Sequence, residues 1–424
     1  MYASRIKEKK TSWGGRIFVT TYPAQGSVSI VGSILGGSRL SSAQWAKVHA
    51  AMLLEGTRSH SKKELQIMLD TIGASLSFYA TNDRLCFAGR VRAVHIQALL
   101  ALIMELLAEP TFPEAELAIL KKREETALTL EAQDTRAQAS IAFARALFTK
   151  QHPNFSETTA ESRQELVRMT RTSLVALHRK ILNGQSLILS LAGDITLPRG
   201  ASLVEKYFKR LPHKRVMLPS YTKAFPTKPQ HIALPIAHKA SIDYLLGLTV
   251  GIDNDHPDFP ALLLGLQILG SPRGFTGRLM KTVREKEGFT YGVYAYAAGF
   301  SLKLDGYIFI WGTFAPELFA QGRKAIMREI TLIAENGVSE KEVKKHREMF
   351  EARTRVRLST SEAFAQSAHD LAAEGRAMTY LDEFSKRILM LSAKEINPVL
   401  KRYLKLKQMV ESAAGPVEQN MLSQ

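Results

Sequence analysis

The hydrophobic positions of this chain follow two different periods, which together predict a mixed α/β protein. Alternating or β-branched runs, typical of strands, occupy residues 27–35, 75–81, 84–91, 187–192, 241–250, 289–297 and 304–311. Amphipathic runs, typical of helices, occupy residues 43–54, 62–72, 93–107, 113–147, 171–182, 257–269, 275–287, 316–335, 339–358 and 393–404. No apolar run approaches the ~20 residues that cross a bilayer, so we expect no membrane partner.

The chain contains an internal repeat. Residues 169–193 align without a gap with residues 391–415. Each copy starts at a residue that can cap a helix, Thr170 or Ser392, continues as an amphipathic helix and ends in a strand closed by a glycine. Self-similarity of this kind predicts two halves that share one fold.

The repeat sets the expected domain organisation. We expect an N-terminal αβ half at residues 1–212, a linker at 213–230 and a C-terminal αβ half at 231–424. The stretch LPHKRVMLPSYTKAFPTKPQ, which contains the linker, has four prolines and no sustained hydrophobic period.

The composition adds a strong positive charge. Lysine and arginine number 57 against 40 acidic residues, a formal net charge of +17. This charge is spread along helices and not gathered in an Arg/Gly-rich tail, so it favours an acidic partner or a solvated face over nucleic-acid recognition. A single cysteine, Cys86, excludes an intramolecular disulfide and a cysteine zinc cage, and favours a reducing cytoplasm.

The most informative segment, residues 269–296, reads LGSPRGFTGRLMKTVREKEGFTYGVYAY. It combines a Gly/Pro loop, a cationic helix and the start of a strand, with donors on Arg284 and Tyr291 that suit gripping a carbonyl or carboxylate. The segment resembles the second half of the pitrilysin/insulinase family of zinc peptidases, which includes the mitochondrial processing peptidases and related bacterial proteins. The residues that carry the match are Leu269, Gly270, Phe275, Thr276, Gly277, Arg278, Leu279, Arg284, Glu285, Gly288, Phe289 and Tyr291.

Further matches to this family lie in the first half. They are GSILGGSRLSS at 32–42, EGTRSHSKKEL at 55–65 and LAGDI at 191–195, so the resemblance covers nearly the whole chain. It implies an α+β fold of two homologous αβ halves. Each half is expected to be a mostly antiparallel sheet backed by helices, and the two are expected to close like a clam around a chamber.

The zinc motif of the family is absent. In active members the helix before Gly-Thr carries His-x-x-Glu-His, which places both histidines on one helical face toward the metal. Counting back from residues 56–57 puts this motif at residues 47–51. Lys47 then stands at the first ligand position, Ala50 at the catalytic base and Ala51 at the second ligand.

The other candidate ligands are no better. The third family ligand, a glutamate, is expected near Leu128 or Thr129, and neither residue binds zinc. His49 could salvage a metal with His60, but a helix-surface or satisfied core histidine is the favoured interpretation. Glu124 and Glu125 are interpreted as part of a solvated face in preference to a catalytic pair. For Lys47 the favoured interpretation is an exposed lysine, and the alternative is an ammonium that supplies positive charge where zinc would be.

The resemblance implies a function in trans. Several family peptidases are heterodimers in which one chain has lost the zinc motif but keeps the arginine and tyrosine of its second half. We therefore expect a non-catalytic subunit whose Arg284 and Tyr291 bind substrate or the developing oxyanion at the zinc site of a homologous partner. The expected substrate-binding loop consists of Gly270, Gly274, Phe275 and Arg278.

Cofactor and activity follow from the same hypothesis. This chain is expected to hold no cofactor, with zinc in the partner subunit, a peptide as substrate and metalloendopeptidase activity only in the complex. The alternative is a peptide-binding or scaffold pseudo-peptidase with no role in catalysis. Structural interpretations also stay open at this point: Arg284 pairing with Glu285 or Glu287, and Tyr291 filling a core.

Overall fold

The chain folds into two compact units, each assembled from three segments. The computed structural model describes residues 2–23, 26–224, 228–271 and 274–423. Unit 1 comprises Met1–Leu128, Ala160–Ser220 and Thr354–Asp382, and unit 2 comprises Thr129–Thr159, Tyr221–Arg353 and Glu383–Gln424. The sequence-based division at 213–230 stays a prediction; residues 225–227 of that linker lie outside the described residues.

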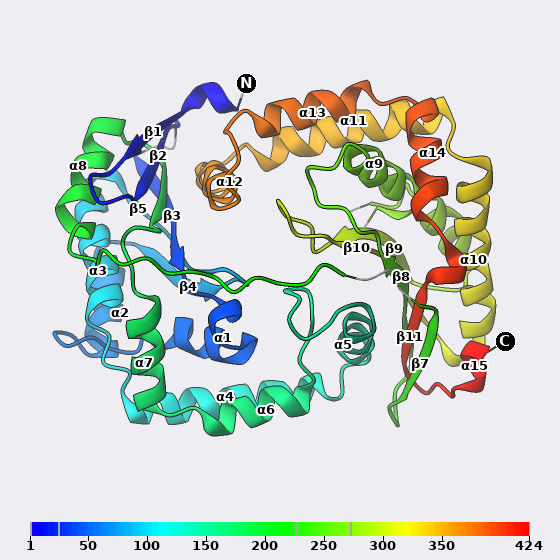
Figure 1. The fold of residues 1–424 in the computed structure, drawn as a ribbon, viewed down its shortest axis with the longest axis horizontal. Helices are drawn as coiled ribbons and strands as arrows, with labels where there is room; N and C mark the ends of the chain where they lie inside the picture. The colour runs from blue at the N-terminus through cyan, green and yellow to red at the C-terminus, as the bar shows by residue number, and fades with distance from the viewer. Residues whose placement is uncertain (1, 24–25, 225–227, 272–273, 424) are drawn as a thin grey trace. The chain divides into compact units, whose positions relative to one another are not determined.

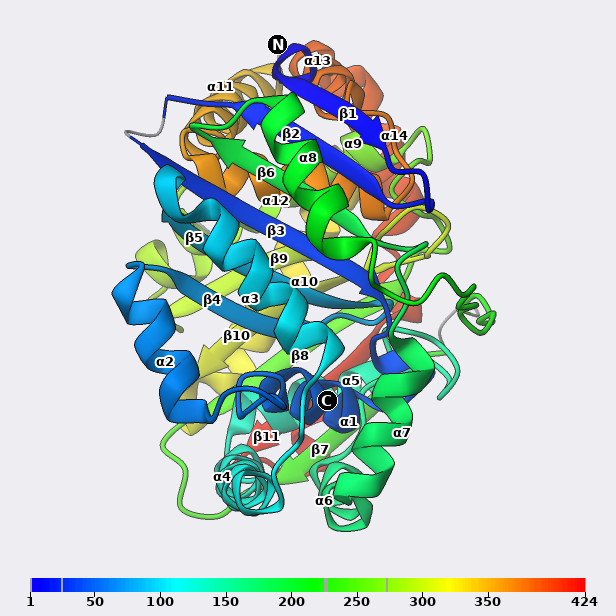
Figure 2. The ribbon, with the colours of Figure 1, turned by 90° about the vertical axis from the view of Figure 1, so that its left-hand side faces the viewer.

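Unit 1 contains a six-stranded sheet in the order β1-β2-β6-β3-β5-β4. Its strands are β1 (Ile6–Lys10), β2 (Arg16–Thr21), β3 (Ser27–Leu35), β4 (Ser75–Ala80), β5 (Arg84–Arg92) and β6 (Ile188–Gly193). All neighbours are antiparallel except β2 and β6, which run parallel. Helices α3 and α8 cover one face of this sheet, as Figure 2 shows, and α12 packs on β6, β3 and β2 from the other side (Figure 1).

Unit 2 contains a five-stranded sheet in the order β7-β11-β8-β10-β9. Its strands are β7 (Gln230–Pro235), β8 (Ile242–Thr249), β9 (Gly292–Ala298), β10 (Tyr307–Phe314) and β11 (Val410–Gly415). Again one neighbouring pair, β7 and β11, is parallel and the others are antiparallel. Helix α5 packs on β11, β8 and β7, while α9, α10 and α14 pack together on the other side (Figure 1).

The helices occur singly or in groups between these strands along the chain. They are α1 (Ala43–Met52), α2 (Lys62–Thr71), α3 (Ile96–Ala108), α4 (Glu114–Glu131), α5 (Thr135–Leu147), α6 (Thr159–Arg168), α7 (Arg171–Ile181), α8 (Leu197–Phe208), α9 (Phe259–Gly270), α10 (Phe319–Asn336), α11 (Glu340–Arg357), α12 (Ser361–Ala373), α13 (Tyr380–Met390), α14 (Ala393–Tyr403) and α15 (Asn420–Ser423). A π-helix, η4, spans Met280–Lys286. None of the described helices combines the length and apolar character needed to cross a bilayer.

The two sheets confirm the internal repeat. Strands β2, β6, β3, β5 and β4 occupy the same order in unit 1 as β7, β11, β8, β10 and β9 in unit 2. The repeated strands β6 and β11 end alike, at Gly193 (φ 139°) and Gly415 (φ 136°). A Cβ there would lie 2.2 Å from the Ser27 carbonyl oxygen or 2.5 Å from that of Ser241, so both positions require glycine.

Each compact unit contains one helix that comes from the other half of the sequence. Helix α5 belongs to the first half of the sequence but covers the second sheet, and α12 belongs to the second half but covers the first sheet. Phe143 of α5 and Phe364 of α12 are both buried in these contacts. Neither sequence half therefore contains all the apolar surface that its own sheet needs.

Two predicted helices were wrong in detail. The run 113–147 was expected to be one helix, but it breaks between α4 and α5, where the Asp134 carboxylate accepts a hydrogen bond from Ala137 N at 2.7 Å and caps the second helix. The run 275–287 was expected to be an α-helix, but Glu287 N donates to the Thr282 carbonyl, a π-type bond. Periodicity does not reveal either event, because the apolar positions continue through both.

A buried ion pair joins α10 to β11 in unit 2. Arg323 donates from Nε to Glu411 Oε2 at 2.6 Å and from Nη2 to Oε1 at 3.0 Å. The Tyr244 hydroxyl donates to the same carboxylate at 2.6 Å, and all three side chains are buried. A carboxylate held by two such donors has no access to water, so it depends on them.

The variant Glu411→Gln is expected to lower the free energy of unfolding of unit 2 by about 3 kcal/mol, because it leaves the Arg323 charge buried and unpaired. Urea unfolding followed by the fluorescence of the buried Trp311, which lies in unit 2, measures this loss. Glu383→Gln, an exposed carboxylate of the same unit, serves as the control and should change stability by less than about 0.5 kcal/mol. Equal effects of the two variants would contradict the structural role of the pair.

Candidate functional site

The helix that should carry the zinc motif is present and well formed. Helix α1 begins at Ser42, whose hydroxyl accepts a hydrogen bond from Trp45 N at 3.3 Å. Lys47 and Ala51 stand one turn apart on it, and Ala50 is buried against the core. The Lys47 side chain is 59% exposed.

The Lys47 ammonium is bound to a carboxylate from another helix. Its Nζ lies 2.5 Å from Oε2 of Glu124 on α4, and Gln44 Nε2 donates to the same oxygen at 3.4 Å. Glu124 is only 6% exposed. The Glu124 carboxylate therefore binds both Gln44 and Lys47 of α1. Ala51 follows Lys47 on the same face of this helix, one turn later.

Glu124 is the residue that the sequence interpretation missed. The prediction of a solvated face was wrong for Glu124, whereas the Glu125 side chain is 46% exposed and pairs with Arg163. The third-ligand position was expected at Leu128 or Thr129. Leu128 lies one helical turn beyond Glu124 on α4 and is buried in the core of unit 1. The missed signal was Glu124 itself, a carboxylate in the buried stripe that contains Leu117, Leu120 and Leu128.

These residues do not fit zinc. A zinc site needs nitrogen, sulfur or carboxylate ligands, and here only Glu124 qualifies. The Lys47 ammonium has no lone pair to offer in its charged form, and Ala51 has no ligand atom. Among the described residues, no group of three or more histidines, cysteines or carboxylates is placed to hold a metal ion.

The two histidines near this helix have structural partners. His49 is buried, and its Nε2 lies 3.0 Å from Nδ1 of His178, which also bonds the Leu107 carbonyl through Nε2 at 2.9 Å. Burial, and then the neighbouring His178, lower the pKa of His49 to about 3. His60 bonds Glu105 at 2.8 Å instead. The interpretation of His49 as a satisfied core histidine is confirmed.

The second candidate region lies in unit 2, around η4. Arg284 of η4 is partly buried, and its guanidinium lies 4.7 Å from the ring centroid of Phe275, which is itself exposed. Gly288 (φ 70°) ends η4 and turns the chain toward β9. Tyr291, just before β9, is 91% exposed.

The positions of Tyr291 and Arg284 bear on the two purely structural roles that the sequence left open for them. Tyr291 does not fill a core. The alternative pairing of Arg284 with Glu285 or Glu287 is not recorded among the described residues either, and Glu287 accepts a hydrogen bond from Arg328 at 2.6 Å. The catalytic roles of Arg284 and Tyr291 stay predictions.

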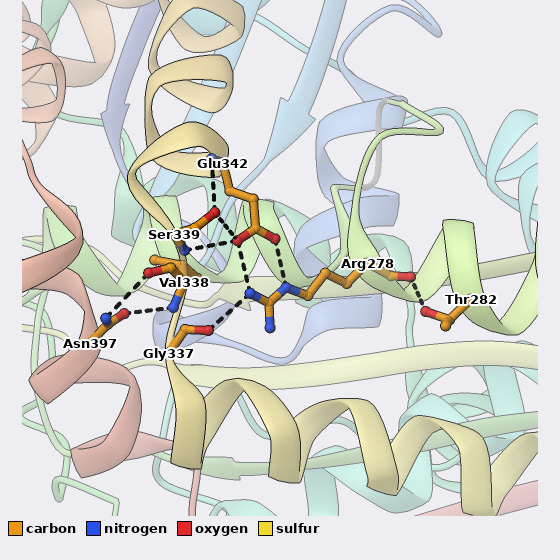
Figure 3. Close-up of polar contacts among 7 residues, drawn as sticks. All are labelled: Arg278, Thr282, Gly337, Val338, Ser339, Glu342 and Asn397. Carbon is orange, nitrogen blue, oxygen red and sulfur yellow. Dashed lines mark hydrogen bonds and ion pairs between the residues drawn. The ribbon is translucent and has the colours of Figure 1, made fainter.

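Arg278, predicted in the substrate-binding loop, is engaged within unit 2 (Figure 3). Its Nε and Nη2 donate to the two oxygens of Glu342 at 2.7 and 2.9 Å, and Nη2 also donates to the Gly337 carbonyl. Burial alone would raise the pKa of Glu342, but the hydrogen bonds from Arg278 and Ser339 lower it to about 2. This geometry ties the start of η4 to α11; contact with a substrate stays a prediction.

The glycines of the predicted loop pack closely. A Cβ on Gly270 would lie 2.9 Å from Ala295 N, and one on Gly277 would lie 2.7 Å from the Gly270 Cα. A Cβ on Gly274 would lie 2.7 Å from Nη2 of Arg353. Pro272 and Arg273 of this loop lie outside the described residues.

Comparisons with known proteins agree with this geometry. A family model described as the peptidase M16 inactive domain matches residues 168–350. The Helicobacter pylori protein named "Non-peptidase homolog YmxG" is 20% identical over 363 residues, which cover 85% of this chain and 82% of that protein. The Pongo abelii protein named "Mitochondrial-processing peptidase subunit beta" is 19% identical over 385 residues, covering 87% of this chain and 75% of that one.

A solved structure confirms the predicted α+β fold class. It is described as the peptidase M16 inactive domain from Pseudomonas fluorescens and superimposes with a TM-score of 0.88 at 22% identity, covering 97% of this chain and 98% of that one. Together with the missing metal ligands at Lys47 and Ala51, the family model and the relatives support an inactive member of the M16 pitrilysin/insulinase family, that is, a pseudo-peptidase.

Proposed function

We propose that this chain is the non-catalytic subunit of a heterodimeric zinc metallopeptidase and supplies Arg284 and Tyr291 in trans to the zinc site of its partner. The observation that carries the proposal is the 91% exposure of Tyr291. The described structure records no partner for its hydroxyl. An exposed tyrosine combines a large apolar ring with a hydrogen-bonding tip, a combination typical of binding surfaces.

The neighbouring strand shows that this exposure is not imposed by the sheet. Tyr294 and Tyr296 on β9 are both partly buried, and their rings stack on Trp311 and Phe309 at 5.5 and 5.0 Å. The same strand therefore buries aromatic rings where it has partners for them. Tyr291 is left to meet another molecule.

Arg284 complements this group. Its guanidinium is oriented by the Phe275 ring, and no carboxylate is recorded beside it in the described structure, so its donors remain for a substrate carbonyl or oxyanion. Phe275 adds exposed apolar surface for a peptide side chain. The net charge of +17 favours association with an acidic partner or peptide.

The loss of the zinc motif at Lys47, Ala50 and Ala51 supports a non-catalytic role for this chain. With Lys47 bound to Glu124, the described residues offer no set of ligands that would hold zinc and activate water on it. A relative is named a non-peptidase homologue, and another is named as one subunit of a processing peptidase. Arg284 and Tyr291 would therefore act on a substrate that is bound at the zinc site of a second chain.

Peptide cleavage by the complex tests the proposal. This chain is co-expressed with a zinc-carrying M16 chain from the same source that contains His-x-x-Glu-His. Tyr291→Phe and Arg284→Ala are each expected to lower kcat by roughly 10²-fold, the usual effect of removing one donor to an oxyanion. Thermal unfolding should be unchanged for Tyr291→Phe, because this hydroxyl is exposed.

Arg210→Ala removes an exposed arginine of unit 1 and is the control; it should leave kcat unchanged. Cleavage that proceeds equally well without this chain, or with both donor variants, would contradict a role in trans. A complex that assembles but cleaves independently of these residues would favour the scaffold alternative.

A metal-binding experiment tests whether Glu124 keeps the third-ligand position. The double variant Lys47→His/Ala51→His is expected to bind about one zinc ion, since two histidines one turn apart would join a carboxylate already in place. Adding Glu124→Gln should weaken zinc binding at least about tenfold. Isothermal titration and metal analysis of the purified chains measure both effects.

Wild-type chain serves as the control and is expected to bind no stoichiometric zinc. Zinc bound by the wild type would overturn the pseudo-peptidase account. Zinc binding by the double variant that ignores Glu124→Gln would show that this carboxylate does not face the former metal position.

A further inference from the structure

A pocket lies in unit 1, at one end of its sheet. It has a volume of about 510 Å³ and is lined by the ends of β2, β3, β5 and β6, by the C-terminal end of α12 and by residues 214–216. This size is within the range of small-molecule sites. None of the residues of the degenerate zinc face, Lys47, Ala51 or Glu124, takes part in it.

A buried arginine without an acidic partner forms the wall of this pocket. Arg84 is only 8% exposed. Its Nε donates to Ser33 Oγ at 2.5 Å, and its Nη2 donates to the carbonyl oxygens of Ser33 and Ser186 at 3.2 and 2.5 Å. All of these acceptors are neutral, whereas buried guanidinium groups are normally matched by a carboxylate.

The nearby acidic groups are already engaged. Asp83 bonds Arg39 at 2.8 Å, and Glu374, the single acidic residue of the pocket wall, bonds Arg376 at 2.9 Å. Burial lowers the pKa of Arg84 to about 10, as expected for a cation taken out of water without a full counter-charge. Within the described residues, the Arg84 guanidinium therefore hydrogen-bonds only to neutral groups, and the charge of Asp83 acts on it without a direct bond.

One nitrogen of this guanidinium remains for a ligand. No hydrogen bond is recorded for Nη1 within the described residues, and Nη1 is also not among the fully enclosed polar atoms that lack a partner. It therefore retains surface, and the surface that Arg84 lines is this pocket. Its two N–H groups are fixed in direction, because the other donors of the same planar group are held by Ser33 and Ser186.

The rest of the wall adds positive charge. Of its four basic residues, Arg16 is engaged by Glu8 and by the Ala372 carbonyl at the end of α12. Lys214 reaches the Arg179 carbonyl, which leaves its charge uncompensated by a carboxylate. Arg215 is exposed, and no ion pair is recorded for it in the described structure.

The wall also indicates the size and kind of ligand. It contains no aromatic ring among the described lining residues, so it offers no stacking surface for a nucleobase. We propose that this pocket binds a compact multivalent anion, a phosphate compound or a polycarboxylate, with Arg84 as the buried anchor and Lys214 and Arg215 at the rim. Oxyanions of both kinds match fixed N–H donors surrounded by positive charge.

Isothermal titration at low ionic strength tests this site with two probes, inorganic pyrophosphate and citrate. The wild-type chain is expected to bind at least one of them with about one equivalent per chain, and the stronger probe distinguishes a phosphate from a carboxylate ligand. Lys214→Ala/Arg215→Ala should weaken binding by roughly tenfold or more. Arg84→Lys, which keeps the charge but loses the planar donors, should weaken it as well.

The matched control is Lys344→Ala/Lys345→Ala, which removes the same charge from exposed positions on α11. It should change affinity by less than about twofold, because a screened charge elsewhere contributes little. Failure of the wild type to bind either probe, equal losses in the pocket and control variants, or full affinity in Arg84→Lys would each overturn the proposal. The outcome is independent of peptidase activity, so it can fail while the role in trans holds.

Discussion

Burying a charge requires a partner for it, and this constraint connects the main features of the structure. Unpaired, a carboxylate or guanidinium inside a protein costs several kcal/mol. In unit 2 the cost is met by the buried pair of Glu411 with Arg323, and Glu342 pairs with Arg278 in the same way at a half-buried position. In unit 1 the carboxylate of Glu124 lies on the buried stripe of α4, and it needs a cation equally.

At α1 this requirement explains how a metallopeptidase fold can persist without its metal. The resemblance assigns the two zinc-binding histidines to positions 47 and 51 of this helix, and Glu124 lies against the residue at the first of them, Lys47. Here the Lys47 ammonium neutralises that carboxylate at 2.5 Å, and its stem reaches from an exposed position on the helix. The ammonium thus supplies a counter-charge for the buried carboxylate, while the positions assigned to the catalytic base and the second ligand carry alanines. The same principle draws attention to Arg84, because its hydrogen-bond partners are neutral and an anionic ligand could supply the counter-charge.

Much of the architecture could be predicted from the sequence, because hydrophobic periods and repeats report local structure directly. The helix caps at Thr170 and Ser392 and the strand-ending glycines were visible as patterns, and both repeats fold as expected. The exchange of α5 and α12 between sheets was not predictable, since amphipathic helices do not encode which sheet they cover. The burial of Glu124 was missed, because the charged run around it resembles a solvated face and the sequence does not show which helix faces α4. The exposure of Tyr291 was equally invisible, because the run 289–297 was expected to be a strand in which Tyr291 shares a face with Phe289 and Val293.

The central claim is that the surface around Tyr291 meets the zinc site of another chain. The most direct measurement places a photoreactive benzoylphenylalanine at residue 291 and irradiates the complex with a zinc-carrying M16 chain. Mass spectrometry then locates the cross-link. The account predicts a cross-link to the partner's peptide that contains the His-x-x-Glu-His helix or its immediate neighbours, and its loss when a peptide inhibitor fills the site. Cross-links confined to remote surfaces of the partner, or to a second copy of this chain, would contradict it.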